Sequence, residues 1–431
     1  MESRFPQDLD AWLAYIEAQH PKSIAMGLER THILIQRLNL YPNVPIVMVG
    51  GTNGKGSTTT LIEHIYHEAG YRVGCYTSPH LIRYNERVRL NGRDVTDTQL
   101  CQAFAAIERV RDGIALTYFE YGTLSAVWLF MQQNVDVMIL EVGLGGRLDA
   151  VNAFTPTCSI VTSIDLDHTE YLGDTREAIA FEKAGIFRHH VAAICGEPDP
   201  PDTLLQQAEK VGAYLLMIGK DFGFVRQESG FIYQEHQQAI YTLPQLTLKG
   251  EFQFFNASCA ICAVRVLQAQ LPVNPEAIHR AIATTTLMGR FQKVRRCPDV
   301  IFDVAHNPHA AISLAKNLQA SQSSGRTRAV FAMLADKDVK GVIHAVMHEI
   351  DNWYIADIDH VRGAKADFLR DLLILEVKNE KIKLYADAWL AFESAYKDAT
   401  ENDRIIVFGS FFTVALVMER INQSTIFLLE K

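Results

Sequence analysis

The sequence lacks the features that mark membrane, secreted and nucleic-acid-binding proteins. No apolar run approaches the roughly 20 residues that a helix needs to cross a bilayer, and residues 1–8 contain no apolar core of a signal peptide. Basic charge is scarce as well, because 50 acidic side chains outnumber 41 basic ones and leave a formal net charge of −9. This balance gives no support for general electrostatic binding to nucleic acid. We therefore expect a cytoplasmic enzyme that uses neither a membrane nor nucleic acid.

Cysteine is too sparse to build a disulfide framework. The seven cysteines are an odd number scattered over 431 residues, a length that buries a core without covalent cross-links. Cys259 and Cys262 have the spacing of a metal or redox pair, but no second pair accompanies them. We expect two buried residues of one helix rather than a zinc or redox site.

Strand and helix patterns alternate along most of the chain, which predicts an α/β fold. In the first part we expect strands at 45–49, 73–76, 135–142, 158–164 and 192–195 and helices at 9–17, 27–38, 57–69, 124–132, 175–187, 250–270 and 275–284. Residues 215–248 read as short strands and turns of a small antiparallel patch. The alternation restarts beyond residue 286, with strands at 300–304, 328–331, 353–356 and 404–408. We therefore expect a P-loop-type, mostly parallel sheet domain over 1–286 and a smaller Rossmann-like α/β domain over 287–431.

A glycine-rich turn lies between an apolar strand and a helical pattern. Residues 51–57 read Gly-Thr-Asn-Gly-Lys-Gly-Ser. Glycines let backbone N–H groups point at an anion, the helix start adds positive potential, the lysine reaches the outer phosphates, and the hydroxyl reaches a metal ion. The usual phosphate loop places Ser or Thr directly after the lysine, whereas Gly56 intervenes here. The stretch predicts a nucleoside triphosphate site, and the alternative is a turn that holds no ligand.

Polar side chains follow several predicted strands. Glu141 ends one strand, Asp167 and His168 follow another, and Ser78 lies just past the strand that ends at Tyr76. The carboxyl ends of parallel strands face the ligand crevice of an open sheet, and Mg²⁺ prefers oxygen ligands. Glu141 is therefore a candidate Mg²⁺ ligand, with Asp167 and His168 as further ligands or orienting groups. The alternatives are a solvated strand end and a structural histidine.

Other candidate functional residues are indicated less strongly by the sequence pattern around each of them. Composition alone makes Lys183 a surface lysine on a helix. Residues 117–120 (Thr-Tyr-Phe-Glu) combine an aromatic pair with a carboxylate, and they fit either a ligand contact or ordinary core with a helix cap. In the second domain a polar cluster containing Asp303 and His306 ends a strand, and Arg290 lies at the expected hinge.

Taken together, these motifs resemble the folylpolyglutamate synthase family, in particular its bacterial bifunctional dihydrofolate synthase/folylpolyglutamate synthases, within the Mur ligase superfamily. The resemblance covers nearly the whole chain and rests on seven stretches. They are residues 27–30, 51–57, 77–81, 141–150, 167–169, 182–188 and 303–308. The glycine after Lys55 is a mark of this family, since the related Mur cell-wall ligases place the hydroxyl residue directly after the lysine.

The resemblance implies a Mur ligase central-type ATP-binding domain over 1–286 and a glutamate ligase domain over 287–431. It also implies an ATP-dependent amide ligase. The γ-phosphoryl group of ATP passes to a pteroate or folate carboxylate, and the nitrogen of L-glutamate then attacks the acyl phosphate, releasing ADP and phosphate. Mg²⁺ is the expected ion, with K⁺ as a further candidate. Nothing in the sequence demands more than a monomer.

The family pattern assigns roles to particular residues of this sequence. Ser78, Glu141 and His168 would hold the metal, with Ser57 and a CO₂-carbamylated Lys183 as additional ligands. Lys183 and His306 are the expected catalytic residues. The ATP contacts implied by the resemblance are Thr52, Asn53, Gly54, Lys55, Gly56, Ser57, Asn256, Arg290 and Asp303, the last three across the domain interface.

The resemblance also implies a pterin site, formed by Ala25, Met26, Gly27, Thr117, Tyr118, Phe119, Glu120, Leu148, Asp149 and Ala150. The chain departs from close relatives at Ala25, which has no side chain able to form a hydrogen bond. Three other functions remain as alternatives. They are folylpolyglutamate synthase activity alone, a Mur-type ligase for cell-wall precursors, and a nucleotide-dependent switch without ligase chemistry.

Overall fold

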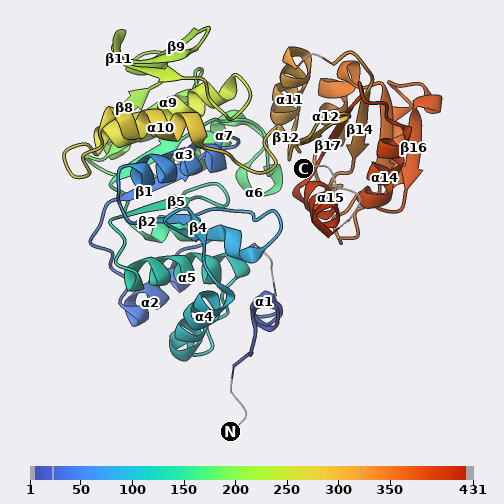
Figure 1. Cartoon of the computed structure of the whole chain (residues 1–431). Coiled ribbons are helices and arrows are strands. Elements are labelled where there is room, and N and C mark those ends of the chain that lie inside the picture. Colours follow the sequence, from blue (N-terminus) through green and yellow to red (C-terminus); the bar gives the residue numbers. More distant parts are fainter. Residues whose placement is uncertain (1–4, 22–23, 322, 424–431) are drawn as a thin grey trace. The chain divides into compact units, whose positions relative to one another are not determined.

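The structure is a computed structural model that describes residues 5–21, 24–321 and 323–423 (Figure 1). The chain divides into two compact units, one formed by residues 1–247 with 253–285 and the other by residues 248–252 with 286–431. Among the helices of the described ranges, we find none whose length and hydropathy would let it cross a membrane.

An eight-stranded sheet forms the centre of the first unit, in the order β4-β3-β2-β5-β1-β6-β7-β8. Six neighbouring strands of this sheet run parallel, namely β2, β5, β1, β6, β7 and β8. At one edge, β3 pairs antiparallel with β2, and β4 pairs antiparallel with β3. The central strands are apolar and fully buried, as expected where helices cover both faces. The strands are β1 (Ile46–Gly50), β2 (Val73–Tyr76), β3 (Val88–Leu90), β4 (Arg93–Asp94), β5 (Val137–Glu141), β6 (Cys158–Val161), β7 (Ala192–Cys195) and β8 (Tyr214–Met217).

Helices lie on both faces of this sheet (Figure 1). Helices α3 (Lys55–Glu68), α9 (Phe252–Val266) and α10 (Pro275–Thr284) lie on one side, and α2 (Glu29–Leu38), α4 (Asp97–Arg111) and α5 (Tyr118–Gln132) lie on the other. The remaining helices are α1 (Leu9–Glu17), α6 (Thr169–Leu172), α7 (Arg176–Ala184), α8 (Asp202–Val211) and the 3₁₀ turns η1 (Tyr84–Arg87) and η2 (Ala150–Ala153). Cys259 and Cys262 are buried, unpaired residues of α9, as the sequence predicts.

A three-stranded antiparallel sheet packs against α9. It consists of β9 (Phe222–Gln227), β10 (Gly230–Glu235) and β11 (Gln238–Pro244), and the rings of Phe224 and Phe231 contact Phe254 of α9. The predicted antiparallel patch is thus present, but its first part is not antiparallel, because β8 joins the main sheet parallel to β7.

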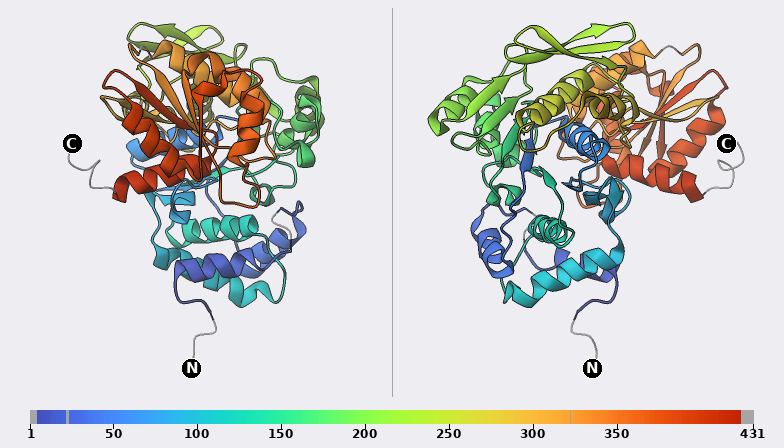
Figure 2. Two further views of the ribbon diagram at one scale, coloured as in Figure 1. Left: turned by 90° about the vertical axis from the view of Figure 1, so that its right-hand side faces the viewer. Right: turned by 60° about the vertical axis from the view of Figure 1, so that its left-hand side comes forward.

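The second unit contains a six-stranded sheet in the order β12-β13-β17-β14-β15-β16. Five strands run parallel, and β12 pairs antiparallel with β13. Helices α14 and α15 pack on one face, and α11, α12 and α13 cover the other (Figure 2). The strands are β12 (Gln292–Arg295), β13 (Asp299–Phe302), β14 (Thr327–Phe331), β15 (Asn352–Ala356), β16 (Ile382–Tyr385) and β17 (Arg404–Phe408). The helices are α11 (Pro308–Ala320), α12 (Val339–Val346), the 3₁₀ turns η3 (Met347–Glu349) and η4 (Asn379–Lys381), α13 (Ala366–Leu373), α14 (Ala388–Asp398) and α15 (Phe411–Gln423).

Several predicted boundaries are wrong for identifiable reasons. The helix expected from residue 57 begins at Lys55, directly after a left-handed Gly54. The helix expected from residue 124 begins at Tyr118, because Thr117 and Glu120 form a capping box there. The sequence also does not predict α4, α8, the short strands β3 and β4, or the edge strands β12 and β16 of the second sheet.

Candidate active site

The glycine-rich loop after β1 is held in place by the segment that follows β6. The Thr52 amide donates to the Ser163 carbonyl at 2.8 Å, and the Asn53 amide donates to the Ser163 hydroxyl at 3.0 Å. The Thr52 hydroxyl donates to the carbonyl of Asp165 at 3.0 Å. Neighbouring parallel strands thus present their carboxyl ends together, and these hydrogen bonds hold the loop against the segment that follows β6.

Asn256 of α9 packs against the turn of the loop. Gly54 has a φ of +86°, and a Cβ at this position would lie 2.3 Å from the Asn256 side-chain oxygen. Asn256 in turn donates to Gln253 at 3.0 Å, and Gln253 donates to the Ser57 hydroxyl at 3.3 Å. The predicted ATP contacts 52–57 and Asn256 therefore lie together, and Gly56 places Ser57 in a buried position beside α9.

The Lys55 ammonium lies over its own loop. It donates to the carbonyls of Gly51 and Thr52 at 3.0 and 3.1 Å. The Lys55 ammonium therefore lies at the amino end of α3, where the backbone N–H groups and the helix dipole also favour binding of an anion.

Glu141 and Ser78 are brought together by the pairing of β2 with β5. Ser78 follows β2, and its amide donates to a carboxylate oxygen of Glu141, the last residue of β5, at 3.2 Å. Glu141 is 3% exposed, so it is not a solvated strand end. In the described part of the chain, no three His, Cys, Asp or Glu side chains gather as a metal cluster. A buried carboxylate with hydroxyl oxygens nearby fits Mg²⁺, which is usually held by one or two carboxylates, waters and substrate phosphates.

His168 lies at the amino end of α6 in a left-handed conformation, with a φ of +51°. Its amide donates to Asp167 at 2.9 Å, and its Nε2 lies 3.8 Å from the other oxygen of that carboxylate. The carboxylate therefore orients both the backbone and the ring of His168.

Lys183 is buried on α7, contrary to the surface position that composition alone favours. Its side chain is only 3% exposed, and no described residue forms a hydrogen bond with its ammonium. Burial and, to a smaller extent, the nearby Lys55 charge lower the pKa of Lys183 to about 7, and Asp167 opposes the shift. These electrostatic neighbours place Lys183 with the phosphate loop and the Asp167–His168 turn. Near neutral pH the amine is therefore partly uncharged and nucleophilic.

Residues 143–150 form a tight loop between β5 and η2. A Cβ at Gly146 would lie 2.7 Å from the carbonyl of Glu182, and the Arg147 amide donates to that carbonyl at 2.8 Å. Asp149 accepts from the amides of Leu144 and Val151 at 2.8 and 3.0 Å. Burial raises the pKa of Asp149 to about 7, although these amides and Lys55 oppose the shift.

Several of the predicted pterin-binding residues converge on this loop. The Gly27 amide donates to the carbonyl of Leu148 at 3.3 Å. The Met26 side chain reaches Gly145, and the ring of Phe119 covers Gly143. Ala150 begins η2 directly after Asp149. The three sequence segments expected to bind the pterin are therefore adjacent in space.

Thr117 and Glu120 also cap a helix. They form the capping box of α5, in which the Glu120 carboxylate accepts from the Thr117 amide at 2.7 Å. Arg30 of α2 donates to Glu120 at 3.0 Å and to the carbonyl of Ala25 at 2.8 Å. Arg30 thus joins two of the predicted pterin segments. No pattern in the sequence predicts a role for Arg30, because only the fold shows what it contacts.

A second set of predicted residues gathers within residues 286–431. The Asp303 carboxylate accepts from the amides of Phe291 and Ala305 at 2.9 and 2.8 Å, and burial raises its pKa to about 6 while Arg290 opposes the shift. The Arg290 guanidinium lies 5.5 Å from the ring of Phe411. His306 bonds through Nδ1 to the carbonyl of Val304 at 2.8 Å, and since a carbonyl only accepts, Nδ1 carries the proton.

Arg87 and His80 form a further polar pair beside these segments. Arg87 donates through Nε to His80 Nδ1 at 2.8 Å, and its guanidinium lies 5.3 and 5.4 Å from the rings of Tyr84 and Tyr118. Burial, with the Arg87 charge, lowers the pKa of His80 to about 4. His80 lies within the stretch 77–81 that carries the family resemblance, whereas no periodicity or spacing in the sequence signals Arg87.

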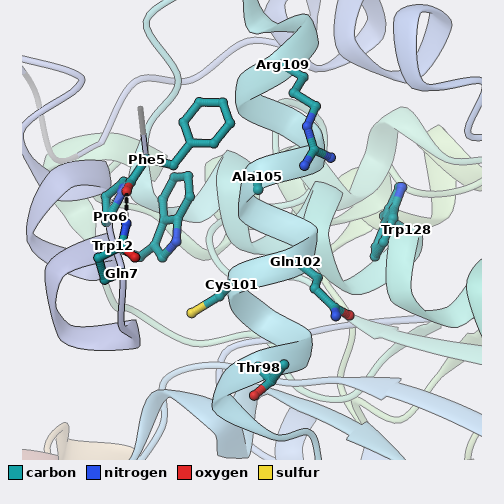
Figure 3. Close-up of a pocket in the computed structure, with 10 residues that line it drawn as sticks. All are labelled: Phe5, Pro6, Gln7, Trp12, Thr98, Cys101, Gln102, Ala105, Arg109 and Trp128. Atoms are coloured by element: carbon teal, nitrogen blue, oxygen red, sulfur yellow. Dashed lines mark hydrogen bonds between the residues drawn. The ribbon is translucent and has the colours of Figure 1, made fainter. Parts of the chain in front are cut away.

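A separate hollow lies away from these residues, along α4 (Figure 3). It has a volume of about 430 Å³, with Phe5 and Trp12 on one side of α4 and Trp128 on the other, and Arg109 belongs to α4 itself. None of the predicted site residues lines it.

The chain matches two protein-family models. Residues 49–264 match the Mur ligase middle domain, and residues 289–411 match the Mur ligase glutamate ligase domain.

Individual relatives cover almost the full length. The dihydrofolate synthase/folylpolyglutamate synthase of Escherichia coli K12 is 44% identical over 96% of this chain and 96% of its own length. The protein of the same name from Haemophilus influenzae is 39% identical over 96% of this chain and 98% of its own.

Solved structures of proteins with these names are also similar to this chain over almost its full length. E. coli FolC in complex with DHPP and ADP has a TM-score of 0.92 at 43% identity, covering 97% of this chain and 99% of that one. A bifunctional folylpolyglutamate synthase/dihydrofolate synthase with Mn, AMPPNP and L-glutamate bound has a TM-score of 0.90 at 41% identity, covering 96% and 98% of the two chains.

Proposed function

Because the chain belongs to the Mur ligase family, we propose that it is an ATP-dependent dihydrofolate synthase/folylpolyglutamate synthase, which adds L-glutamate to dihydropteroate and to reduced folates. One observation carries the proposal. The phosphate loop and Glu141 follow or end neighbouring parallel strands, with Lys183 of α7 electrostatically close to Lys55, in a chain that is 44% identical to such an enzyme over 96% of its length.

The reaction has two steps. A carboxylate oxygen of the pteroate or folate attacks the γ-phosphorus of ATP, and ADP leaves. The amine of L-glutamate then attacks the carbonyl carbon of the acyl phosphate, loses a proton, and expels phosphate as the amide bond forms. Little covalent chemistry falls to the protein, so catalysis depends on positioning and on stabilising the charge of the transferring group.

We assign ATP binding to Thr52, Asn53, Gly54, Lys55, Gly56, Ser57 and Asn256 of the first domain, residues 1–286. The amides at the start of α3 and the Lys55 ammonium provide donors and positive charge for the phosphates. In the glutamate ligase domain, residues 287–431, we assign Arg290 and Asp303 to ATP binding and His306 to the phosphate or acyl phosphate group. The hydrogen bond from His306 Nδ1 to the carbonyl of Val304 fixes the orientation of its ring.

Glu141, Ser78 and His168 are the proposed ligands of a divalent cation, with Ser57 and a modified Lys183 completing the set. A bound Mg²⁺ neutralises negative charge on the phosphates during transfer. The buried Glu141 carboxylate fits this ion, and a relative of known structure contains Mn with AMPPNP.

We propose that Lys183 is carbamylated, and the environment of its amine supports this. The uncharged amine attacks the carbon of CO₂, a C–N bond forms as one C=O π bond opens, and the nitrogen releases a proton, which converts the buried neutral amine into an anionic carbamate. The lowered pKa of about 7 and the absence of a hydrogen-bond partner among the described residues both favour this reaction. Growth in ¹³C-bicarbonate should give a carbamate signal in the ¹³C NMR spectrum that Lys183→Ala removes and that Lys210→Ala, at an exposed position on α8, retains.

The pterin site is proposed to comprise Ala25, Met26, Gly27, Thr117, Tyr118, Phe119, Glu120, Leu148, Asp149 and Ala150. Its support is the contact of Gly27 with Leu148 and of Phe119 with Gly143. A relative of known structure contains DHPP with ADP. We further propose that the protein acts as a monomer.

The decisive experiment compares substrates side by side. Purified protein, ATP, Mg²⁺ and L-glutamate are incubated with dihydropteroate, with tetrahydrofolate, or with a UDP-linked muramyl precursor, and ADP release is followed. We expect release with both pterins and none with the muramyl substrate. Release that does not depend on a pterin would exclude the proposal.

A further inference from the structure

Arg87 has an unusual environment for a half-buried cation. Its guanidinium is held by two rings, those of Tyr84 at 5.3 Å and Tyr118 at 5.4 Å, and by the Nδ1 acceptor of His80 at 2.8 Å. These neighbours are neutral, and they fix the plane of the guanidinium without cancelling its charge.

Neighbouring arginines of the same segment are paired with carboxylates, whereas Arg87 is not. Arg83 lies 2.9 Å from Asp97, and Arg89 lies 2.6 Å from Glu63. Among the described residues, no carboxylate forms an ion pair with Arg87. A rigid, stacked guanidinium that keeps its full charge is suited to bind a planar anion from outside the chain, and a carboxylate matches its paired donors.

The position of Arg87 joins the two halves of the proposed site. Its carbonyl accepts from the Thr77 amide at 2.9 Å, and Thr77 precedes Ser78, which contacts Glu141. On the other side, Tyr118 precedes Phe119, whose ring covers Gly143 of the pterin-side loop. A carboxylate bound here would therefore belong to a molecule that extends from the pterin segments toward the metal residues.

The two substrates of the proposed reaction differ in one relevant way. Dihydropteroate has a single carboxylate, which must be the one that is phosphorylated. A folate ends in a glutamyl unit with two carboxylates, so one of them stays anionic while the other reacts.

We propose that Arg87 binds the unreacted carboxylate of a folate substrate and thereby determines how well the enzyme uses folates relative to dihydropteroate. This assignment rests on the proposed ligase function and extends it to substrate choice. A carboxylate of the incoming L-glutamate has the same chemistry, so the experiment must separate the two sources.

The test measures kcat/KM for tetrahydrofolate and for dihydropteroate, and the KM for L-glutamate with each. The variants are Arg87→Met, which keeps the length of the side chain without its charge, and Arg87→Lys, which keeps the charge without the planar fork. Arg83→Met is the matched control, because Arg83 is an exposed arginine of the same segment. Thermal melting confirms that each variant is folded, and Arg87→Gln replaces Arg87→Met if the latter is not.

Loss of a charged hydrogen bond corresponds to about a tenfold to hundredfold effect. We expect Arg87→Met to lower the tetrahydrofolate to dihydropteroate ratio of kcat/KM by that factor, Arg87→Lys to lower it less, and Arg83→Met to leave it unchanged.

Two outcomes overturn the inference. An equal fall with both pterins would make Arg87 a structural residue, and a rise in the KM for L-glutamate with both pterins would assign it to the amino acid. Wild-type protein that uses neither pterin would instead reject the ligase function itself.

Discussion

Burial controls the charge of Lys183. Its pKa of about 7, against an ordinary value of 10.5, means that the folded chain lacks a proton that the unfolded chain holds between these two values. Unfolding therefore takes up a proton in this window, so stability rises as pH increases from about 7 and is lowest below it.

This gives a prediction for Lys183→Met, a substitution of similar length without a titrating group. In CO₂-free buffer the variant should melt at a higher temperature than wild type near and below pH 7, and the rise in wild-type stability between about pH 7 and pH 9 should flatten. Melting curves across this range check it. The same pH slope in both proteins would show that Lys183 is not the group responsible. Ligation by the variant should fall at least about a hundredfold, because a group that stabilises the transferring charge is lost.

The start of α3 depends on Gly54 and on Asn256 of α9, whose side chain packs against Gly54. Gly54 and Gly70 have nearly the same φ, +86° and +90°, but a Cβ at Gly54 would meet Asn256 whereas one at Gly70 would meet nothing within 4 Å. Alanine at either position costs about 1–2 kcal/mol in backbone strain. We expect Gly54→Ala to cost about 1–3 kcal/mol more than Gly70→Ala because of the clash.

Denaturant unfolding of the two variants measures this difference. Combining Gly54→Ala with Asn256→Ala should recover the additional loss, since the second substitution removes the clashing oxygen. Equal losses for Gly54→Ala and Gly70→Ala would mean that Asn256 does not constrain the loop.

The amino end of α5 tests whether Thr117 serves the substrate as well as the helix. Thr96 forms an equivalent capping box with Gln99 at the start of α4. Thr117→Ala and Thr96→Ala should each lower stability by about 1 kcal/mol. We expect only Thr117→Ala to raise the KM for dihydropteroate, because only this box adjoins the proposed pterin segments. An unchanged KM would assign Thr117 to capping alone.

The two units of the chain have separate interiors. Residues 286–431 bury their own core, which includes Ile301, Leu314, Phe331 and Trp353, around a complete six-stranded sheet. We expect this fragment to fold by itself with a cooperative thermal transition. It should show no ligation, since Lys55, Glu141 and Lys183 belong to the other unit. Circular dichroism during heating checks the prediction, and a fragment without a transition would contradict it.

The sequence indicated the phosphate loop, the α/β class and the polar strand ends, because each depends on local pattern. Glycines next to Lys55, apolar runs of strand length and a carboxylate at the end of one such run are visible without a fold. Segments with weak periodicity were not found, and the caps at Thr96 and Thr117 show why, since side-chain hydrogen bonds set those boundaries.

By itself the sequence therefore determined which chemical groups the protein has and which strand or turn carries each. Only the tertiary structure decided their states. It buried Lys183 so that its pKa falls to about 7, set Ser78 against Glu141, and left Arg87 stacked on tyrosines without a described carboxylate partner. These properties arise from residues far apart in the chain, whose burial and electrostatic environment no local pattern contains.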